Sequence, residues 1–207
     1  MKTLVITLLM AFTSLMNAQA TYEKGMGKAF ELWEAKNNQE AIDLFERIAK
    51  AEKDNWIPYY YAAQIGILGT FEIEDVTMKK IQLEKAEQYL NESKSRTKDN
   101  VEVLVLEAIF YTAKLMTDPG TYGPTLSPKI EGMYQQAKAM APNNPRVVAQ
   151  HANWKMGSAK FFGKDPKVYC PELEKALALF DTEKESVPFY PSWGKERTQN
   201  QIEECKK

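Results

Sequence analysis

The chain has 207 residues and a formal net charge of −1, with 27 basic and 28 acidic side chains. A balanced charge without a Lys/Arg cluster argues against a nucleic-acid partner. The length suits one domain with a continuous core, and the abundance of helix formers with few β-branched runs predicts an all-α protein.

The first twenty residues have the pattern of a secretory signal peptide. Lys2 supplies the positive start, and residues 4–16 form an apolar run interrupted only by Thr and Ser. The small residues Ala18 and Ala20 predict cleavage after Ala20, with cleavage after Ala18 as the second choice. Loss of Lys2 would change the formal charge from −1 to −2.

We therefore expect a signal peptide over residues 1–20 and one helical domain over residues 21–207, located in the periplasm or secreted. The alternative is a retained membrane anchor, but the apolar run is short for a bilayer span and polar sequence follows it. No cysteine directly follows the predicted cleavage site, so we expect no lipoprotein. Charges break every later apolar stretch, which predicts no membrane span after signal cleavage.

Nine helices are expected in chain order, and the first eight pair into four hairpins. The predicted pairs are 22–36 with 38–53, 56–69 with 75–97, 100–116 with 127–141, and 145–158 with 171–184. A ninth helix over 192–205 is expected to cap the array with a polar face, which carries Lys195, Glu196, Arg197, Glu203 and Glu204.

A turn-forming pair recurs between these hairpins. Asp54-Asn55, Asp99-Asn100 and Asn143-Asn144 are separated by steps of 45 and 44 residues, and each pair lies between two amphipathic stretches. Each pair therefore predicts a helix end followed by the N-cap of the next helix.

Small residues recur at fixed positions in the flanking helices. Eight positions after the turn asparagines lie Ala63, Ala108 and Ala152. In the other helix of the hairpins, an Ala precedes a large apolar residue by four positions, at Ala41 and Phe45, Ala86 and Leu90, and Ala176 and Phe180. This arrangement resembles the tetratricopeptide repeat (TPR) family, whose small residues let helix A and helix B approach closely.

The resemblance implies a right-handed solenoid of antiparallel helix hairpins, with about four repeats and a C-terminal capping helix. It is strongest over Ala29–Asn55 and Met133–Pro145, and the Trp-Leu-Gly-Tyr pattern of helix A is degenerate. The family's unit has about 34 residues, so the repeats here are stretched. The motif describes packing and implies binding of a protein or peptide without naming it.

The additional residues fall between the two helices of a hairpin. Residues 117–126 and 159–170 are rich in Gly and Pro and are expected to be loops. Such loops gather on one edge of a solenoid and often form its binding face, which makes Tyr122, Phe161 and Phe162 candidate binding residues. The alternative is that the insertions are tolerated surface loops.

The resemblance implies a second candidate site, because helix A lines the concave surface in the family. The corresponding positions combine apolar and amide side chains with one arginine: Trp33, Tyr60, Gln64, Val105, Ile109, Arg146, Asn153 and Met156. They do not form the Lys/Arg clamp that some family members use for C-terminal peptides. The alternative is that these residues pack together as core.

Two cysteines lie at the ends of the last two predicted helices. Cys170 precedes the eighth helix and Cys205 ends the ninth, so an antiparallel pairing of these helices would bring them together. In an oxidising compartment this placement predicts a disulfide; the alternative is two free thiols.

No catalytic or metal-binding motif is present. His151 is the only histidine, and the sequence has no HExxH-like spacing, phosphate loop, nucleophile elbow or CxxC. We therefore expect no enzyme, no cofactor and no metal site, but an envelope scaffold for a protein or peptide. The alternatives are a small-molecule- or glycan-binding accessory protein, which a deep pocket would favour, and an unrecognised enzyme, which carboxylates clustered around His151 would favour.

Overall fold

The structure is a computed structural model that describes residues 19–184 and 187–207. Within these ranges every regular element is a helix. The first helix covers residues 19–34. It is followed by α2 (Asn38–Ala51), α3 (Ile57–Gly69), α4 (Val76–Ser95), α5 (Val101–Thr117), α6 (Pro119–Met140), α7 (Pro145–Phe161), the short 3-10 helix η1 (Pro166–Tyr169), α8 (Cys170–Thr182) and α9 (Lys195–Cys205).

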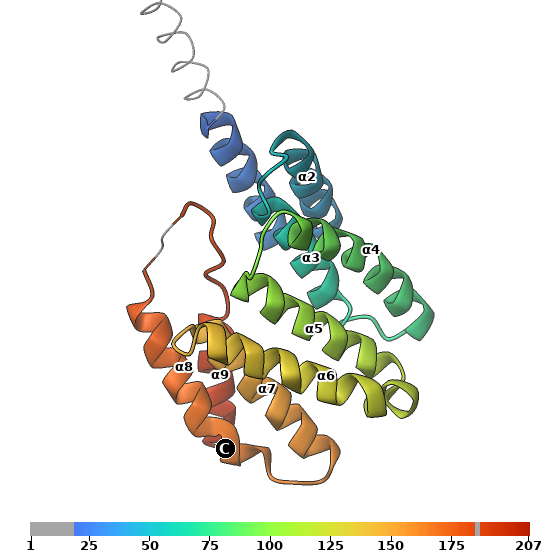
Figure 1. The fold of residues 1–207 in the computed structure, drawn as a ribbon, viewed down its shortest axis with the longest axis vertical. Helices are drawn as coiled ribbons and strands as arrows, with labels where there is room; N and C mark the ends of the chain where they lie inside the picture. The colour runs from blue at the N-terminus through green and yellow to red at the C-terminus, as the bar shows by residue number, and fades with distance from the viewer. Residues whose placement is uncertain (1–18, 185–186) are drawn as a thin grey trace, which may run out of the picture.

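Consecutive helices pack against each other as hairpins, and the hairpins stack along the long axis of the molecule (Figure 1). The packed pairs are α3 with α4, α5 with α6, and α7 with α8. The connections within these three hairpins lie along one side, which we call the loop edge (Figure 1). The fold is therefore the expected all-α stack of helical hairpins.

The repeated asparagines lie at the starts of α3, α5 and α7, as predicted. We call these three the inner helices, and the surface that they share the inner face. The side-chain oxygens of Asn55, Asn100 and Asn144 each accept a hydrogen bond from the backbone N–H two residues later, at 3.0, 2.9 and 2.9 Å. These bonds satisfy N–H groups that have no partner inside the first turn of a helix. The spacing of 44 and 45 residues is thus the structural period.

Small residues allow the helices of a hairpin to approach closely. Ala63, Ala108 and Ala152 are fully buried, as the repeat pattern predicts. Gly66 of α3 lies so near α4 that a Cβ atom added to it would stand 3.0 Å from the Cβ of Ala86. The close packing of α3 on α4 is therefore favoured by glycine, which has no Cβ atom at this position.

The prediction of a loop over residues 117–126 is wrong, because α6 begins at Pro119. Asp118 caps the helix by accepting a hydrogen bond from the N–H of Thr121 at 3.1 Å, and a proline in the first helical position has no N–H to satisfy. Pro124 and Pro128 lie on the exposed side of the helix, where water can bind the carbonyl groups that lose their partners.

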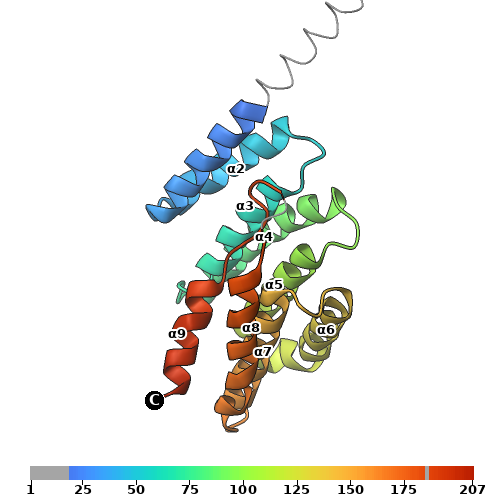
Figure 2. The same cartoon turned by 90° about the vertical axis from the view of Figure 1, so that its left-hand side faces the viewer.

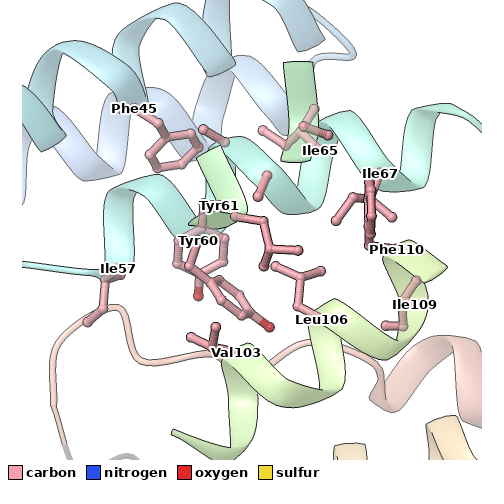
Figure 3. Packing of buried hydrophobic residues seen from close by; sticks show 14 of the residues in the cluster. Phe45, Ile57, Tyr60, Tyr61, Ile65, Ile67, Val103, Leu106, Ile109 and Phe110 are labelled. Carbon is pink, nitrogen blue, oxygen red and sulfur yellow. The ribbon is translucent and has the colours of Figure 1, made fainter. Parts of the chain in front are cut away.

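A core of aromatic and aliphatic side chains joins the first hairpins. Figure 3 shows Tyr60 and Tyr61 of α3 between Phe45 of α2 and the apolar face of α5 that carries Leu106. The ring centroid of Tyr61 lies 5.5 Å from that of Phe45 and 5.4 Å from that of Tyr60. These contacts fix α3 at the centre of the stack.

The chain between α8 and α9 returns to the N-terminal hairpins (Figures 1 and 2). We call residues 187–194 the C-terminal connection. The hydroxyl of Tyr61 donates a hydrogen bond to the carbonyl of Phe189 at 3.0 Å, and the indole N–H of Trp193 donates to the hydroxyl of Tyr60 at 2.8 Å. No pattern in the sequence predicts this long-range contact.

The last helix closes the array, as expected. α9 packs on α8 and buries Thr198 and Ile202, while its predicted charged residues are exposed. Among the described residues no helix combines the length and apolar character needed to cross a membrane. The predicted signal peptide falls mostly in residues 1–18, outside the described residues, so its cleavage stays a prediction.

Candidate functional site

The predicted groove residues lie mainly in the interior. Exposed fractions of 7% or less are found for Tyr60, Gln64, Val105, Ile109 and Arg146, whereas Trp33, Asn153 and Met156 are half-buried. The C-terminal connection covers the inner face at Tyr60, where Trp193 is its hydrogen-bond partner. A ligand would therefore reach Tyr60 only if Trp193 moved. A binding role for the eight residues stays a prediction.

Arg146 lies at the centre of a buried ionic network. Its guanidinium contacts the Glu102 carboxylate at 2.7 and 3.0 Å and also binds both oxygens of Glu183 at the end of α8. Asn144 donates a further hydrogen bond to Glu102 at 2.6 Å. Burial opposes the charge on Arg146, but the hydrogen bonds that Arg146 donates to the Glu183 and Glu102 carboxylates outweigh this effect and raise its pKa. Arg146 of α7 therefore links α5 of the preceding hairpin to the end of α8 in its own hairpin.

Two amides on the inner face have polar atoms without partners. Gln64 and Asn153 stand nine residues after Asn55 and Asn144, so they occupy equivalent positions in their repeats. The side-chain oxygen of Gln64 and both amide atoms of Asn153 are buried and form no hydrogen bond with any residue that the structure describes. An unpaired buried polar atom costs about 1–3 kcal/mol, so a polar partner at these atoms would stabilise the protein.

His151 forms a small polar cluster beside α6. Its Nε2 atom lies 3.0 Å from the nearer carboxylate oxygen of Glu131, and this carboxylate also accepts a hydrogen bond from the indole of Trp154 at 3.1 Å. The imidazole stacks on Tyr134 with 5.3 Å between ring centroids. Burial lowers the pKa of His151, and the bond to Glu131 opposes this only in part. His151 is therefore neutral at neutral pH.

Among the cavities that border the described helices, two are small. One of about 140 Å³ lies between α4, α5 and α6, and one of about 150 Å³ lies between α6, α7 and α8. The second is lined by Lys138, Val147, Val148, His151, Glu172 and Lys175. Pockets for small organic ligands usually measure about 300–1,000 Å³. Within the described residues, no group of three or more His, Cys, Asp or Glu side chains could hold a metal ion.

The candidate residues of the loop edge differ in exposure. Phe161 and Phe162 are 69% and 68% exposed, and their rings contact each other edge to face with centroids 5.1 Å apart. Tyr122 lies in the first turns of α6 and is half-buried. The phenylalanine pair is thus a surface feature, as the binding hypothesis requires, and its role stays a prediction.

A second group of exposed apolar side chains was missed in the sequence. Phe71, Val76, Met78 and Ile81 are between 41% and 57% exposed and lie at the α3–α4 connection and the start of α4; we call them the α4 patch. The spacing of apolar residues along α4 could have indicated this patch. The buried positions of α4 include Leu83, Ala86 and Leu90. Met78 and Ile81, three residues apart, lie off that buried stripe.

The predicted disulfide is confirmed. Cys170 and Cys205 are bonded, with 6.2 Å between their Cα atoms and 35 positions between them in the sequence. The bond connects the first residue of α8 with the last residue of α9, which closes the open end of this hairpin.

The comparisons with known proteins concern the fold. No protein-family model matches the chain, and no curated protein matches its sequence. The solved structure of the HusA haemophore from Porphyromonas gingivalis is similar, with a TM-score of 0.76 and 22% identity over 89% of this chain and 92% of HusA. A thermophilic TPR protein from Thermus thermophilus gives a TM-score of 0.42 and 14% identity over 89% of this chain and 98% of that one.

These values limit what the similarities establish. A TM-score of 0.42 is too low to show a common fold, so the TPR resemblance extends only to the all-α stack of hairpins. At 22% identity the similarity to HusA establishes the arrangement of helices and nothing about ligands. The chain therefore shares its fold with the HusA haemophore.

Proposed function

We propose that the chain is an exported helical scaffold of the cell envelope or the extracellular space that binds a protein or peptide partner and catalyses no reaction. The signal-peptide pattern supports export. The Cys170–Cys205 disulfide also supports it, because such bonds persist in oxidising compartments and are rare in the cytosol.

The distribution of exposed apolar side chains carries the proposal. Large exposed hydrophobic residues of the described chain lie along the loop edge, with only Met140 and Val187 elsewhere. Soluble proteins rarely keep such groups together on the surface unless they bind something. The inner face, in contrast, is filled by the protein's own side chains and by the C-terminal connection. This favours partner binding at the edge.

The α4 patch is the part of the edge that best suits a protein partner. Its apolar side chains are flanked by charges of both signs: Glu72, Glu74, Asp75, Lys79 and Lys80. An apolar centre with a mixed polar rim is the usual composition of a protein–protein interface. The small cavities, at about 140 and 150 Å³, favour a surface contact over an enclosed small molecule.

A photo-crosslinking experiment tests the α4 patch directly. A photoreactive residue is placed at Met78 and, as the matched control, at Met140, which is 39% exposed and lies away from the loop edge. After irradiation in the envelope fraction of the source cells, we expect one specific crosslinked protein from position 78 and none from position 140. The double variant Met78→Asp, Ile81→Asp should lose the partner in a pull-down, and Met140→Asp should retain it.

Two results would contradict this proposal. Equal crosslinking from positions 78 and 140 would mean that the patch is not the contact surface. Retention of the partner by the Met78→Asp, Ile81→Asp variant would have the same meaning. All these side chains are exposed, so circular dichroism is expected to show unchanged helix content for every variant.

Haem carriage is the second candidate function, and the fold shared with the HusA haemophore favours it. Haem is larger than either of these two cavities, so neither could enclose it. The test is a titration of the chain with haem, followed by absorbance in the Soret region. A saturable spectral shift with one site per chain supports carriage, and a linear, unsaturated response eliminates it.

A further inference from the structure

The connection between α7 and α8 has a composition unlike the rest of the surface. Residues 160–168, which we call the tip, contain two exposed phenylalanines, an exposed Val168 and three lysines, against one acidic residue, Asp165. The whole chain, in contrast, has a net charge of −1. Figures 1 and 2 show this connection at one end of the long axis, opposite the helix of residues 19–34.

The backbone holds the phenylalanine pair in a defined position. The N–H of Lys164 bonds to the carbonyl of Ala159 at 2.8 Å, and the N–H of Gly163 bonds to the carbonyl of Lys160 at 3.1 Å. These two bonds form a Schellman motif, which requires the left-handed conformation that Gly163 adopts with φ of 67°. Asp165 then caps η1 by accepting a hydrogen bond from the N–H of Lys167 at 2.9 Å. The exposed rings therefore project from a structured turn.

The lysines of the tip are available for a partner. Among the described residues no carboxylate forms an ion pair with Lys160, Lys164 or Lys167, and all three are exposed. The only acid of the tip, Asp165, accepts the backbone bond that begins η1. The tip therefore combines an exposed apolar surface with three lysines against one acid, a formal charge of +2.

We propose that the tip docks the protein on an anionic lipid surface, with Phe161 and Phe162 inserted at the level of the headgroups and the lysines bound to lipid phosphates. Phenylalanine rings gain by burial at the boundary of headgroups and acyl chains, and lysines beside them add electrostatic attraction to anionic lipid. The α4 patch lacks this charge pattern, since Glu72, Glu74 and Asp75 precede its helix. This inference goes beyond the proposed partner binding and does not depend on it.

Vesicle co-sedimentation tests the inference. The probes are vesicles of phosphatidylcholine alone and of phosphatidylcholine with one third phosphatidylglycerol. Wild-type protein is expected to bind the anionic vesicles, and added salt is expected to weaken this binding. The triple variant Lys160→Gln, Lys164→Gln, Lys167→Gln should bind about 100-fold more weakly, at about fivefold for each lysine.

In the double variant Phe161→Ser, Phe162→Ser, the partition coefficient of the protein onto anionic vesicles should fall about tenfold or more for each ring removed. The matched control is Met140→Ser, an exposed apolar residue away from the loop edge, which should bind like wild type. All variants carry the same N-terminal segment, so any contribution from it is common to them. A Phe162→Trp variant adds a direct readout, because brominated lipids in the vesicles should quench the new indole.

Three results would overturn the inference. They are absence of binding to anionic vesicles, equal binding by wild type and the Phe161→Ser, Phe162→Ser variant, and absence of additional quenching in Phe162→Trp. Capture of a soluble protein through the two phenylalanines without vesicle binding would instead assign the tip to a protein partner. If the protein does not bind vesicles but Met78 still crosslinks to a partner, the membrane inference fails and the proposed function stands.

Discussion

Arg146, one of the predicted groove residues, lies in a buried ionic network that joins neighbouring helices. It is 1% exposed and lies between the carboxylates of Glu102 and Glu183. A buried charge is tolerated only when its hydrogen-bonding groups find partners. The network therefore constrains the relative positions of α5, α7 and the end of α8.

Replacement of Arg146 by Met should destabilise the protein strongly. It would leave the fully buried Glu102 without its cation, and loss of one partner of a buried ion pair costs about 3–5 kcal/mol. The measurement is the free energy of unfolding in urea. As a control, Lys28→Met removes the exposed pair with Glu31 and should change little. A small effect at Arg146 would show that water compensates Glu102 and that the network is not essential.

His151 should give the stability a dependence on pH. Its pKa is lowered in the folded state, so below its ordinary value near 6.5 the unfolded chain binds more protons than the folded one. The protein therefore becomes less stable as the pH falls from about 6.5 towards the lower pKa that His151 has in the folded state. The lowered pKa of Glu131 acts only below its ordinary value of 4.5.

Urea unfolding at about pH 7.5 and about pH 5 measures this dependence in wild type and in His151→Gln. Because His151 is the only histidine, the substitution should flatten the change between the two conditions. Other carboxylates contribute equally to both proteins, so the difference between the slopes is the readout. Identical slopes would mean that His151 titrates normally in the folded protein.

At the scale of elements, the disulfide determines how firmly α9 is attached to α8. The bond spans 35 positions, for which the chain-entropy model gives about 3–4 kcal/mol. We expect Cys170→Ala, Cys205→Ala to lower the free energy of unfolding by about this amount. Reductant should lower the melting temperature of wild type and leave the double variant unchanged. A double variant as stable as wild type would refute a stabilising role of the bond.

Two glycines inside helices should respond to alanine in different ways. Gly132 of α6 has no atom within 4 Å of an added Cβ, so Gly132→Ala should stabilise the protein by about 0.5–1 kcal/mol through helix propensity. At Gly66 the same gain is opposed by the contact at 3.0 Å with Ala86. Thermal unfolding of both variants compares them, and equal stabilisation would mean that α3 and α4 separate easily.

Local patterns predicted the helices well because their signals are local. The turn asparagines, the small residues and the apolar period of 3.6 placed most helix starts and ends within a few residues of those observed. The start of α6 was missed because Gly and Pro were interpreted as loop formers. Pro119 and Gly120 lie in the first turn after the cap Asp118, where a proline has no N–H to satisfy. Pro124 lies further along, on the exposed side of the helix.

The candidate sites were harder to predict, because exposure depends on distant parts of the chain. The loop predicted over 159–170 is shorter than expected, because α7 continues to Phe161 and η1 occupies Pro166–Tyr169. Phe161 and Phe162 nevertheless lie exposed at a helix end that nearby residues form. Tyr60 was placed on an open concave face. Its actual neighbour Trp193 is 133 positions away, and no repeat pattern indicates such a contact.

For the whole molecule, the C-terminal connection changes how a stack of repeats should unfold. A simple solenoid has contacts only between neighbours, so its ends can unfold separately. Here the connection brings the last hairpin into contact with the first ones, through the bonds of Tyr61 to Phe189 and of Trp193 to Tyr60. The contact between distant repeats is expected to make unfolding cooperative.

Trp193→Ala tests this coupling. The change removes a large partly buried ring and the hydrogen bond to the buried Tyr60, at an expected cost of about 2–4 kcal/mol. If the connection couples the two ends, hydrogen exchange should accelerate in α3 as well as in α9, although α3 contains no substitution. As a control, Phe162→Ala at an exposed site should leave exchange in both helices unchanged. Faster exchange confined to α9 would mean that the connection rests on the N-terminal hairpins without stabilising them.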